Sequence, residues 1–137
     1  MDYRIILYHK QSTSARTRFV KFSYNSVCAF EPIPKLAQSI ETIPENTVLL
    51  PSMVLKEAEE KLELEKGLLK AEGGYCHAVE VPGGSIQVIL AAINTIDPPF
   101  EWAEKIDANF VDLTQARGLP PIELELLRHA YELILGG

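Results

Sequence analysis

Cysteine is scarce in this chain of 137 residues: it has two, Cys28 and Cys76, and they form no Cys-x-x-Cys pair. A small secreted domain held together by disulfides carries more cysteines, at framework spacings. We therefore expect two reduced, buried thiols on strands. A chain of this length buries about two thirds of its unfolded surface, enough to fold without a disulfide or a structural metal.

Long hydrophobic runs are also missing. The longest uncharged stretch, Val81 to Ile96, contains a proline, two glycines and several polar residues, so it cannot be a spanning helix. Asp2 and Arg4 precede only a few apolar residues, unlike a signal peptide. These absences predict a cytoplasmic protein that has no membrane partner.

Basic residues are outnumbered, with 13 Lys and Arg against 19 Asp and Glu, a net charge of −6. An acidic chain is a poor match for nucleic acid, whose binding depends on many phosphate contacts. The first 30 residues nevertheless hold five bases and one acid, so their own charge is +4. This basic start is compatible with a small anionic partner.

Catalytic and metal-binding motifs are absent as well. The sequence has no His-Glu-x-x-His, no Glu-x-x-His and no calcium loop. Gly73-Gly74 and Gly83-Gly84 lack the following helix of a phosphate-binding loop. We therefore expect no metal and no cofactor, and the pattern favours a protein that is not an enzyme.

The residues that are present describe one globular domain over 1–137, with 47% hydrophobic and 23% charged residues and no low-complexity linker. Tyr3 to Tyr8 is β-branched and aromatic and predicts a strand. Alternation over Phe19 to Phe30 predicts a second strand, antiparallel to the first. Prolines end it, and a short helix is expected over 35–42, followed by an extended segment over 47–50.

The middle of the chain predicts a helix and a hairpin. Ser52 can cap a helix over Met53 to Lys66, whose Lys and Glu residues form a solvated face, and a glycine at 67 or 73–74 would end it. Tyr75 to Val81 and Ser85 to Ile96 flank a Pro-Gly-Gly turn. The second of these strands is apolar on both faces, so we expect it to be central.

The last third predicts two helices, one from Asp97 to Arg117 and one from Pro120 to Leu135. Residues 109–114 could instead be a short strand. Together the segments predict an α+β fold: an antiparallel sheet of about four strands, in two hairpin-like pairs, with helices packed against it.

The last helix carries the first candidate site. Its apolar residues fill an arc of roughly 220°, wider than an ordinary surface helix hides. Glu123 lies among the apolar positions of its first turn, and His129 lies on the polar arc. This surplus of apolar helix surface suggests a contact with a second chain through Leu124, Leu127, Tyr131 and Leu135. The alternative is a helix wedged inside its own domain.

The second candidate is the basic loop from His9 to Arg18, where hydroxyls stand beside guanidinium groups that can hold an anion. Arg16 and Arg18 would anchor the ligand, with Tyr75 and His77 lining the pocket. The alternative is a solvated hairpin loop. Cys76 and His77 point to opposite faces of a strand, which argues against a shared metal.

Two functions follow. The first is an accessory protein that forms a homodimer or docks a protein partner through its C-terminal helix. The alternative is a small enzyme or ligand-binding domain for an anionic small molecule, held by the 9–18 loop.

Overall fold

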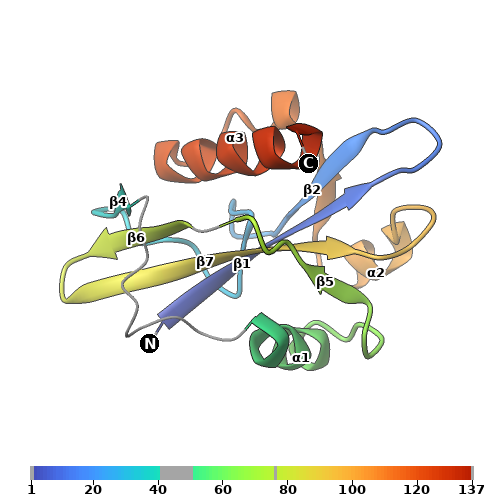
Figure 1. The fold of residues 1–137 in the computed structure, drawn as a ribbon, viewed down its shortest axis with the longest axis horizontal. Helices are drawn as coiled ribbons and strands as arrows, with labels where there is room; N and C mark the ends of the chain where they lie inside the picture. Colours follow the sequence, from blue (N-terminus) through green and yellow to red (C-terminus); the bar gives the residue numbers. More distant parts are fainter. Residues whose placement is uncertain (1, 41–50, 76, 137) are drawn as a thin grey trace.

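The computed structural model describes residues 2–40, 51–75 and 77–136 (Figure 1). Within these ranges the chain forms one mixed sheet of eight strands, three α-helices and a 3-10 helix. In chain order the elements are β1 (Asp2–Lys10), β2 (Thr17–Lys21), β3 (Cys28–Ala29), β4 (Gln38–Ile40), α1 (Pro51–Lys61), β5 (Leu69–Ala71), β6 (His77–Val81), β7 (Gly84–Ile93), α2 (Phe100–Lys105), β8 (Asn109–Val111), η2 (Leu113–Ala116) and α3 (Pro121–Gly136).

The prediction of an antiparallel sheet of about four strands is wrong. The described strands follow the order β4-β6-β7-β1-β2-β8, with β3 paired to β1 and β5 paired to β7. Most pairs are antiparallel, but β1 and β7 run parallel in the centre, from Asp2 opposite Ile86 to Tyr8 opposite Ala92. Parallel pairing joins segments about 80 residues apart in the chain, so no local pattern or turn announces it.

Several predicted strands are confirmed. The Tyr3 to Tyr8 segment lies inside β1, and β2 pairs with it in an antiparallel register. β6 and β7 form the predicted hairpin, whose turn places Gly83 at a φ of +93°, a backbone conformation that favours glycine. β7 is central, as its apolar residues on both faces predict.

The strand predicted over Phe19 to Phe30 is divided. β2 ends at Lys21, and a turn closed by the hydrogen bond from Phe22 N to Ser26 O (2.8 Å) precedes β3. Asn25 takes a φ of +55° in this turn, a conformation that asparagine tolerates better than most residues. Apolar alternation continues through the turn, which is why periodicity alone suggested one strand.

The helix predicted over 35–42 is also wrong for its described part. Residues 38–40 form β4, which pairs with β6. The remainder of that prediction, and the extended segment expected over 47–50, lie outside the described residues. Pairing with an available strand edge has overridden the local helical spacing.

The helix predicted over Met53 to Lys66 is shorter than expected. α1 ends at Lys61, and Glu63 takes a φ of +57° just beyond it. The chain then turns through Gly67 (φ +84°) and returns as β5 along β7. The glycine at 67 therefore serves a loop and does not end the helix.

The helix predicted from Asp97 to Arg117 consists of three pieces. α2 is a short helix, β8 is the strand considered as the alternative for 109–114, and η2 follows. Asp112 caps η2: its side chain accepts from the backbone N of Gln115, whose own side chain accepts from the backbone N of Asp112. The last predicted helix is confirmed as α3.

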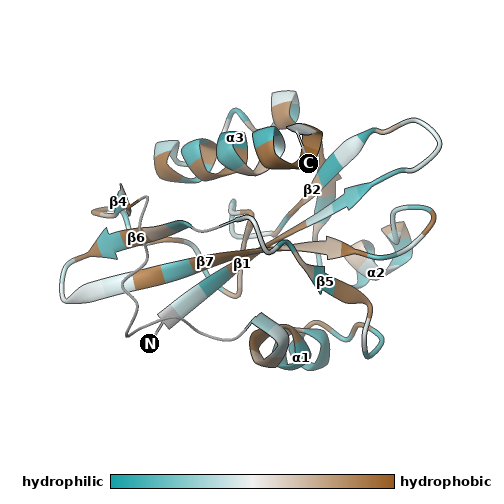
Figure 2. Ribbon diagram, in the orientation of Figure 1, coloured by the Kyte–Doolittle hydropathy of each residue, from teal (hydrophilic) through white to brown (hydrophobic). Residues whose placement is uncertain are grey.

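The sheet separates two hydrophobic cores. α3 covers one face, and α1 and α2 cover the other (Figure 1). Alternation along β1 sends Ile6 and Tyr8 to the α3 side and Ile5 and Leu7 to the α1 side. The hydrophobic stretches of β7 and α3 are visible in Figure 2. In the described part of the chain, none of the helices combines the length and apolar character needed to cross a membrane.

Candidate functional site

The four residues predicted to hold an anion do not come together. Arg18 lies with α2, its guanidinium carbon 5.8 Å from the Phe100 ring centroid. Arg16 is an exposed residue whose Nη2 lies 3.5 Å from Asp112 Oδ2. Tyr75 is buried on the opposite face, where its hydroxyl donates to the carbonyl of Leu126 in α3 at 3.0 Å. The sheet therefore separates Arg18 from Tyr75.

Tyr75 and His77 do lie together, but against α3. Their ring centroids are 4.6 Å apart, and the His77 ring stacks on His129 at 4.6 Å with 26° between the planes. His129 is half-buried, not exposed as its place on the helix suggested. Among the described residues, no group of three His, Cys, Asp or Glu is placed to hold a metal. This cluster is consistent with helix packing.

The four α3 residues predicted as an interface have different environments. Leu127 is fully buried within its own chain, and Leu124 and Tyr131 are partly buried against the same core. Leu135 is 57% exposed. Much of the apolar arc therefore packs on the sheet and its neighbours, as in the alternative of a wedged helix, and self-association stays a prediction.

Cys28 is a buried free thiol on β3, as expected. Burial raises its pKa, and the nearby Glu123 carboxylate adds to this effect. A thiol with a raised pKa is a poor nucleophile at neutral pH. Cys76 lies outside the described residues.

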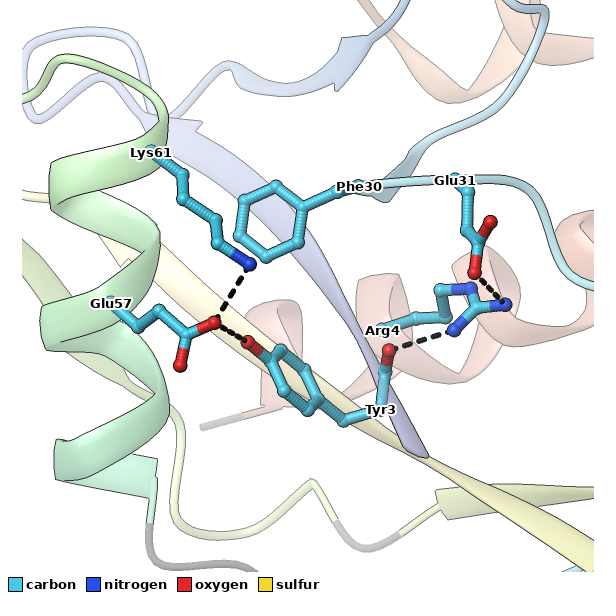
Figure 3. A pocket seen from close by; sticks show the side chains of 6 residues that line it. All are labelled: Tyr3, Arg4, Phe30, Glu31, Glu57 and Lys61. Atoms are coloured by element: carbon cyan, nitrogen blue, oxygen red, sulfur yellow. Dashed lines mark hydrogen bonds and ion pairs between the residues drawn. The ribbon is translucent and has the colours of Figure 1, made fainter. Parts of the chain in front are cut away.

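A pocket with several charged side chains opens beside the first residues of β1 (Figure 3). Its volume is about 280 Å³. We call it the Tyr3 pocket. Three segments supply two lining residues each: the start of β1, the loop after β3 and the helix α1. These residues are Tyr3, Arg4, Phe30, Glu31, Glu57 and Lys61.

One side of the Tyr3 pocket holds an ammonium group. Lys61 Nζ lies 2.8 Å from Glu57 Oε1 and 4.7 Å from the centroid of the Phe30 ring. The Tyr3 hydroxyl donates to the same Glu57 oxygen at 3.1 Å. The hydrogen bonds from Lys61 and Tyr3 lower the pKa of Glu57, and the bond to Glu57 raises the pKa of Lys61.

The other side holds a guanidinium group. Arg4 Nη1 donates to the carbonyl of Tyr3 at 2.9 Å, and its Nε and Nη2 each lie 3.3 Å from the carbonyl of Pro32. Arg4 Nη2 also lies 3.2 Å from Glu31 Oε1. The Arg4 side chain is 4% exposed, whereas that of Glu31 is 68% exposed. A buried cation therefore meets a carboxylate that is mostly in water.

The charges of the Tyr3 pocket balance, with two cations and two carboxylates. Apart from Arg4, the charged side chains are about half exposed or more: Glu57 50%, Lys61 54% and Glu31 68%. Ion pairs between such long, exposed side chains contribute little to stability, because water solvates both partners well. A ligand charge can therefore replace a side chain here at low cost.

A second cavity, of about 340 Å³, lies between α1 and β5. We call it the lysine groove, because Lys56, Lys66 and Lys70 line it above Leu55 and Leu69. Within the described ranges, none of these lysines forms an ion pair. Glu59, which also lines the groove, accepts a hydrogen bond from Leu69 N at 2.9 Å and joins the helix to the strand.

Sequence reasoning missed the Tyr3 pocket. It identified Glu57 and Lys61 only as a solvated helix pair. Arg4, which directly precedes the apolar run Ile5 to Leu7, was the available signal, because a guanidinium buried beside such a run requires several acceptors. No protein-family model matches the chain, and no curated protein matches it either.

Proposed function

We propose that this protein is a non-enzymatic binding domain for a small molecule with an anionic group, and that Arg4 in the Tyr3 pocket holds this group. The observation that carries the proposal is the exposure difference across one ion pair: a guanidinium 4% exposed faces a carboxylate 68% exposed. The ligand class is the one expected from the basic N-terminal segment, but the proposed site lies outside the 9–18 loop.

The environment of Arg4 supports the exchange of Glu31 for a ligand. The guanidinium is fixed by the backbone carbonyls of Tyr3 and Pro32, so its orientation does not depend on Glu31. Hydrogen bonds between charged groups are strong where water is excluded. Glu31 stays 68% exposed while it is paired, so water competes with Arg4 for its carboxylate. A ligand carboxylate or phosphate entering the pocket can take its place.

The test is calorimetric titration of the protein with hexanoate and with inorganic phosphate. We expect Glu31→Gln to tighten binding of the anion, because it removes the competing carboxylate without touching Arg4. Glu132→Gln, an exposed change on α3, is the matched control and should leave affinity unchanged. Arg4→Met should abolish binding, provided that circular dichroism shows a folded variant.

Two results would overturn the proposal. One is that neither anion binds the wild type or the Glu31→Gln variant. The other is binding that is equal in wild type, Glu31→Gln and folded Arg4→Met, which would place the anion elsewhere.

A second candidate function is self-association through α3. Its support is Leu135, which is 57% exposed near the end of a helix whose other apolar residues are more deeply packed. Of the four predicted interface residues, Leu135 is the most accessible to a partner.

A further inference from the structure

We infer that the Tyr3 pocket is a site for an elongated zwitterion, whose two charged ends are represented in the free chain by the protein's own Lys61 and Glu31. The ligand class is a small molecule with an ammonium group at one end and a carboxylate at the other, as in an ω-amino acid. This inference rests on the proposed function, since it uses the same Arg4, and it adds the ammonium end.

The Glu57 side of the pocket has the features of an ammonium site. A carboxylate oxygen lies 2.8 Å from Lys61 Nζ, and an aromatic face lies 4.7 Å from it. Carboxylates and aromatic faces are the two groups that recognise alkylammonium ligands in proteins. The Tyr3 hydroxyl, 3.1 Å from the same oxygen, holds the carboxylate in place. Another ammonium group would find the same two partners, the Glu57 carboxylate and the Phe30 ring, if Lys61 moved away.

The Arg4 side of the pocket complements the first. Glu31 places a carboxylate 3.2 Å from Arg4 Nη2, which is the contact that the carboxylate of a ligand would make. Figure 3 shows the Glu57–Lys61 pair and the Arg4–Glu31 pair on opposite sides of the pocket, with Tyr3 and Phe30 between them. The two rings meet edge to face with centroids 6.3 Å apart. An aliphatic chain between the two charges of the ligand would therefore lie along aromatic side chains.

Charge balance selects a zwitterion over a simple anion or cation. A ligand that displaces both Lys61 and Glu31 removes one positive and one negative charge and supplies one of each. A simple anion would displace Glu31 but leave the ammonium site filled by Lys61. A simple amine would do the reverse. Only a ligand with both charges uses all the fixed partners, Glu57, Phe30 and Arg4.

The two side chains that fill the site in the free chain, Lys61 and Glu31, can move away from it. Lys61 is the last residue of α1, and Glu31 lies in the loop after β3; both side chains are more than half exposed. Long charged side chains of this kind can turn their ends into water while their stems stay in place. The protein's own side chains therefore compete with the ligand. The apparent affinity is the affinity of the open site multiplied by the fraction of time that the site is open.

The experiment compares three matched probes: 6-aminohexanoate, hexanoate, which lacks the ammonium group, and hexylamine, which lacks the carboxylate. Calorimetry is run on the wild type, on Lys61→Met and on Lys66→Met. Lys66 lies in the lysine groove, so Lys66→Met loses the same charge outside the Tyr3 pocket. Alanine, whose two charges are adjacent, tests the need for an elongated ligand.

We expect 6-aminohexanoate to bind the wild type more tightly than either truncated probe or alanine. Lys61→Met should tighten 6-aminohexanoate by about two- to fivefold, because an exposed ion pair of this kind fills the site for roughly half to four fifths of the time. Hexanoate should bind no more tightly to Lys61→Met, because this change leaves Glu57 without a neutralising partner. Lys66→Met should bind every probe as the wild type does.

The possible failures are distinguishable. If hexanoate binds as tightly as 6-aminohexanoate to Lys61→Met, or if Lys61→Met weakens the zwitterion, this inference is overturned while the proposed anion site stands. If alanine binds as well as 6-aminohexanoate, the elongated ligand is overturned. If hexanoate, phosphate and 6-aminohexanoate all fail to bind any folded variant, the proposed function fails as well.

Discussion

A single carboxylate fastens the first turn of α3 to the strand region around β3. Glu123 is fully buried, and its oxygens accept from Val27 N at 2.9 Å and from the backbone N of Ile33. The Ser26 hydroxyl lies 2.9 Å from both oxygens. Its place among apolar residues of the helix was recognisable in the sequence. Its partners were not, because they lie about 90 to 100 residues earlier in the chain.

Glu123→Gln should destabilise the fold. The amide presents a donor to a site that already contains backbone donors, so one buried N–H loses its acceptor. A lost acceptor of this kind costs about 1–3 kcal/mol in the free energy of unfolding. Urea denaturation measures this cost, with Glu125→Gln on the exposed side of α3 as the control. Equal midpoints for the two variants would contradict the fastening role.

The pH dependence of this difference follows from the pKa of Glu123. Burial raises that pKa, despite the opposing hydrogen bonds from Val27, Ser26 and Ile33. The folded chain thus binds this proton more tightly than the unfolded chain. The resulting contribution to stability is fully present below the unfolded pKa and is lost as the pH rises through the folded pKa. The stability advantage of wild type over Glu123→Gln should therefore be largest below about pH 4 and shrink as the pH rises through the folded pKa of Glu123.

At the scale of the element, α3 contains one leucine that is fully buried, Leu127, and one that is exposed, Leu135. Leu127→Ala should lower the free energy of unfolding by about 2–5 kcal/mol, because Leu127 is fully buried. Leu135→Asp should leave the unfolding midpoint near that of the wild type, because this side chain is 57% exposed. Light scattering then tests the proposed self-association: Leu135→Asp should dissociate a dimer formed through α3. A wild type that stays monomeric at high concentration would remove this second candidate function.

α1 shows how two sites can share one helix. Glu57 and Lys61 face the Tyr3 pocket, whereas Lys56 and Glu59 line the lysine groove. The sequence correctly indicated a helix with paired charges at this place. It did not indicate which charges would line a cavity, because that depends on where β1 and β5 approach the helix.

At the scale of the whole molecule, β1 and β7 belong to both cores. Their side chains alternate between the α3 side and the α1 side, so neither core can form without the central pair of strands. We therefore predict that the chain unfolds as one cooperative unit, in agreement with the single domain expected from the sequence.

Trp102 provides a local probe for this prediction. It packs on the α1 side, and its indole N–H donates to the carbonyl of Leu62 at 2.6 Å. Fluorescence of this tryptophan and far-ultraviolet circular dichroism should give coincident urea transitions. Separate midpoints would show that the two sides of the sheet unfold independently.

Sequence by itself determined the elements with strong local signals: the β1 segment, the hairpin of β6 and β7 and the terminal helix. In these segments apolar periodicity and turn residues favour the same conformation that the tertiary structure requires. It also determined that β7 is central, since a strand apolar on both faces must be covered on both.

Tertiary structure decided the rest. The parallel pairing of β1 with β7 and the short strands β3, β4, β5 and β8 depend on distant strand edges, and such pairing outweighs weak local preference. The Tyr3 pocket also depends on segments that are distant in the sequence. Arg4, Glu31 and Lys61 belong to three separate segments, and only folding brings a buried guanidinium and an ammonium group to one cavity.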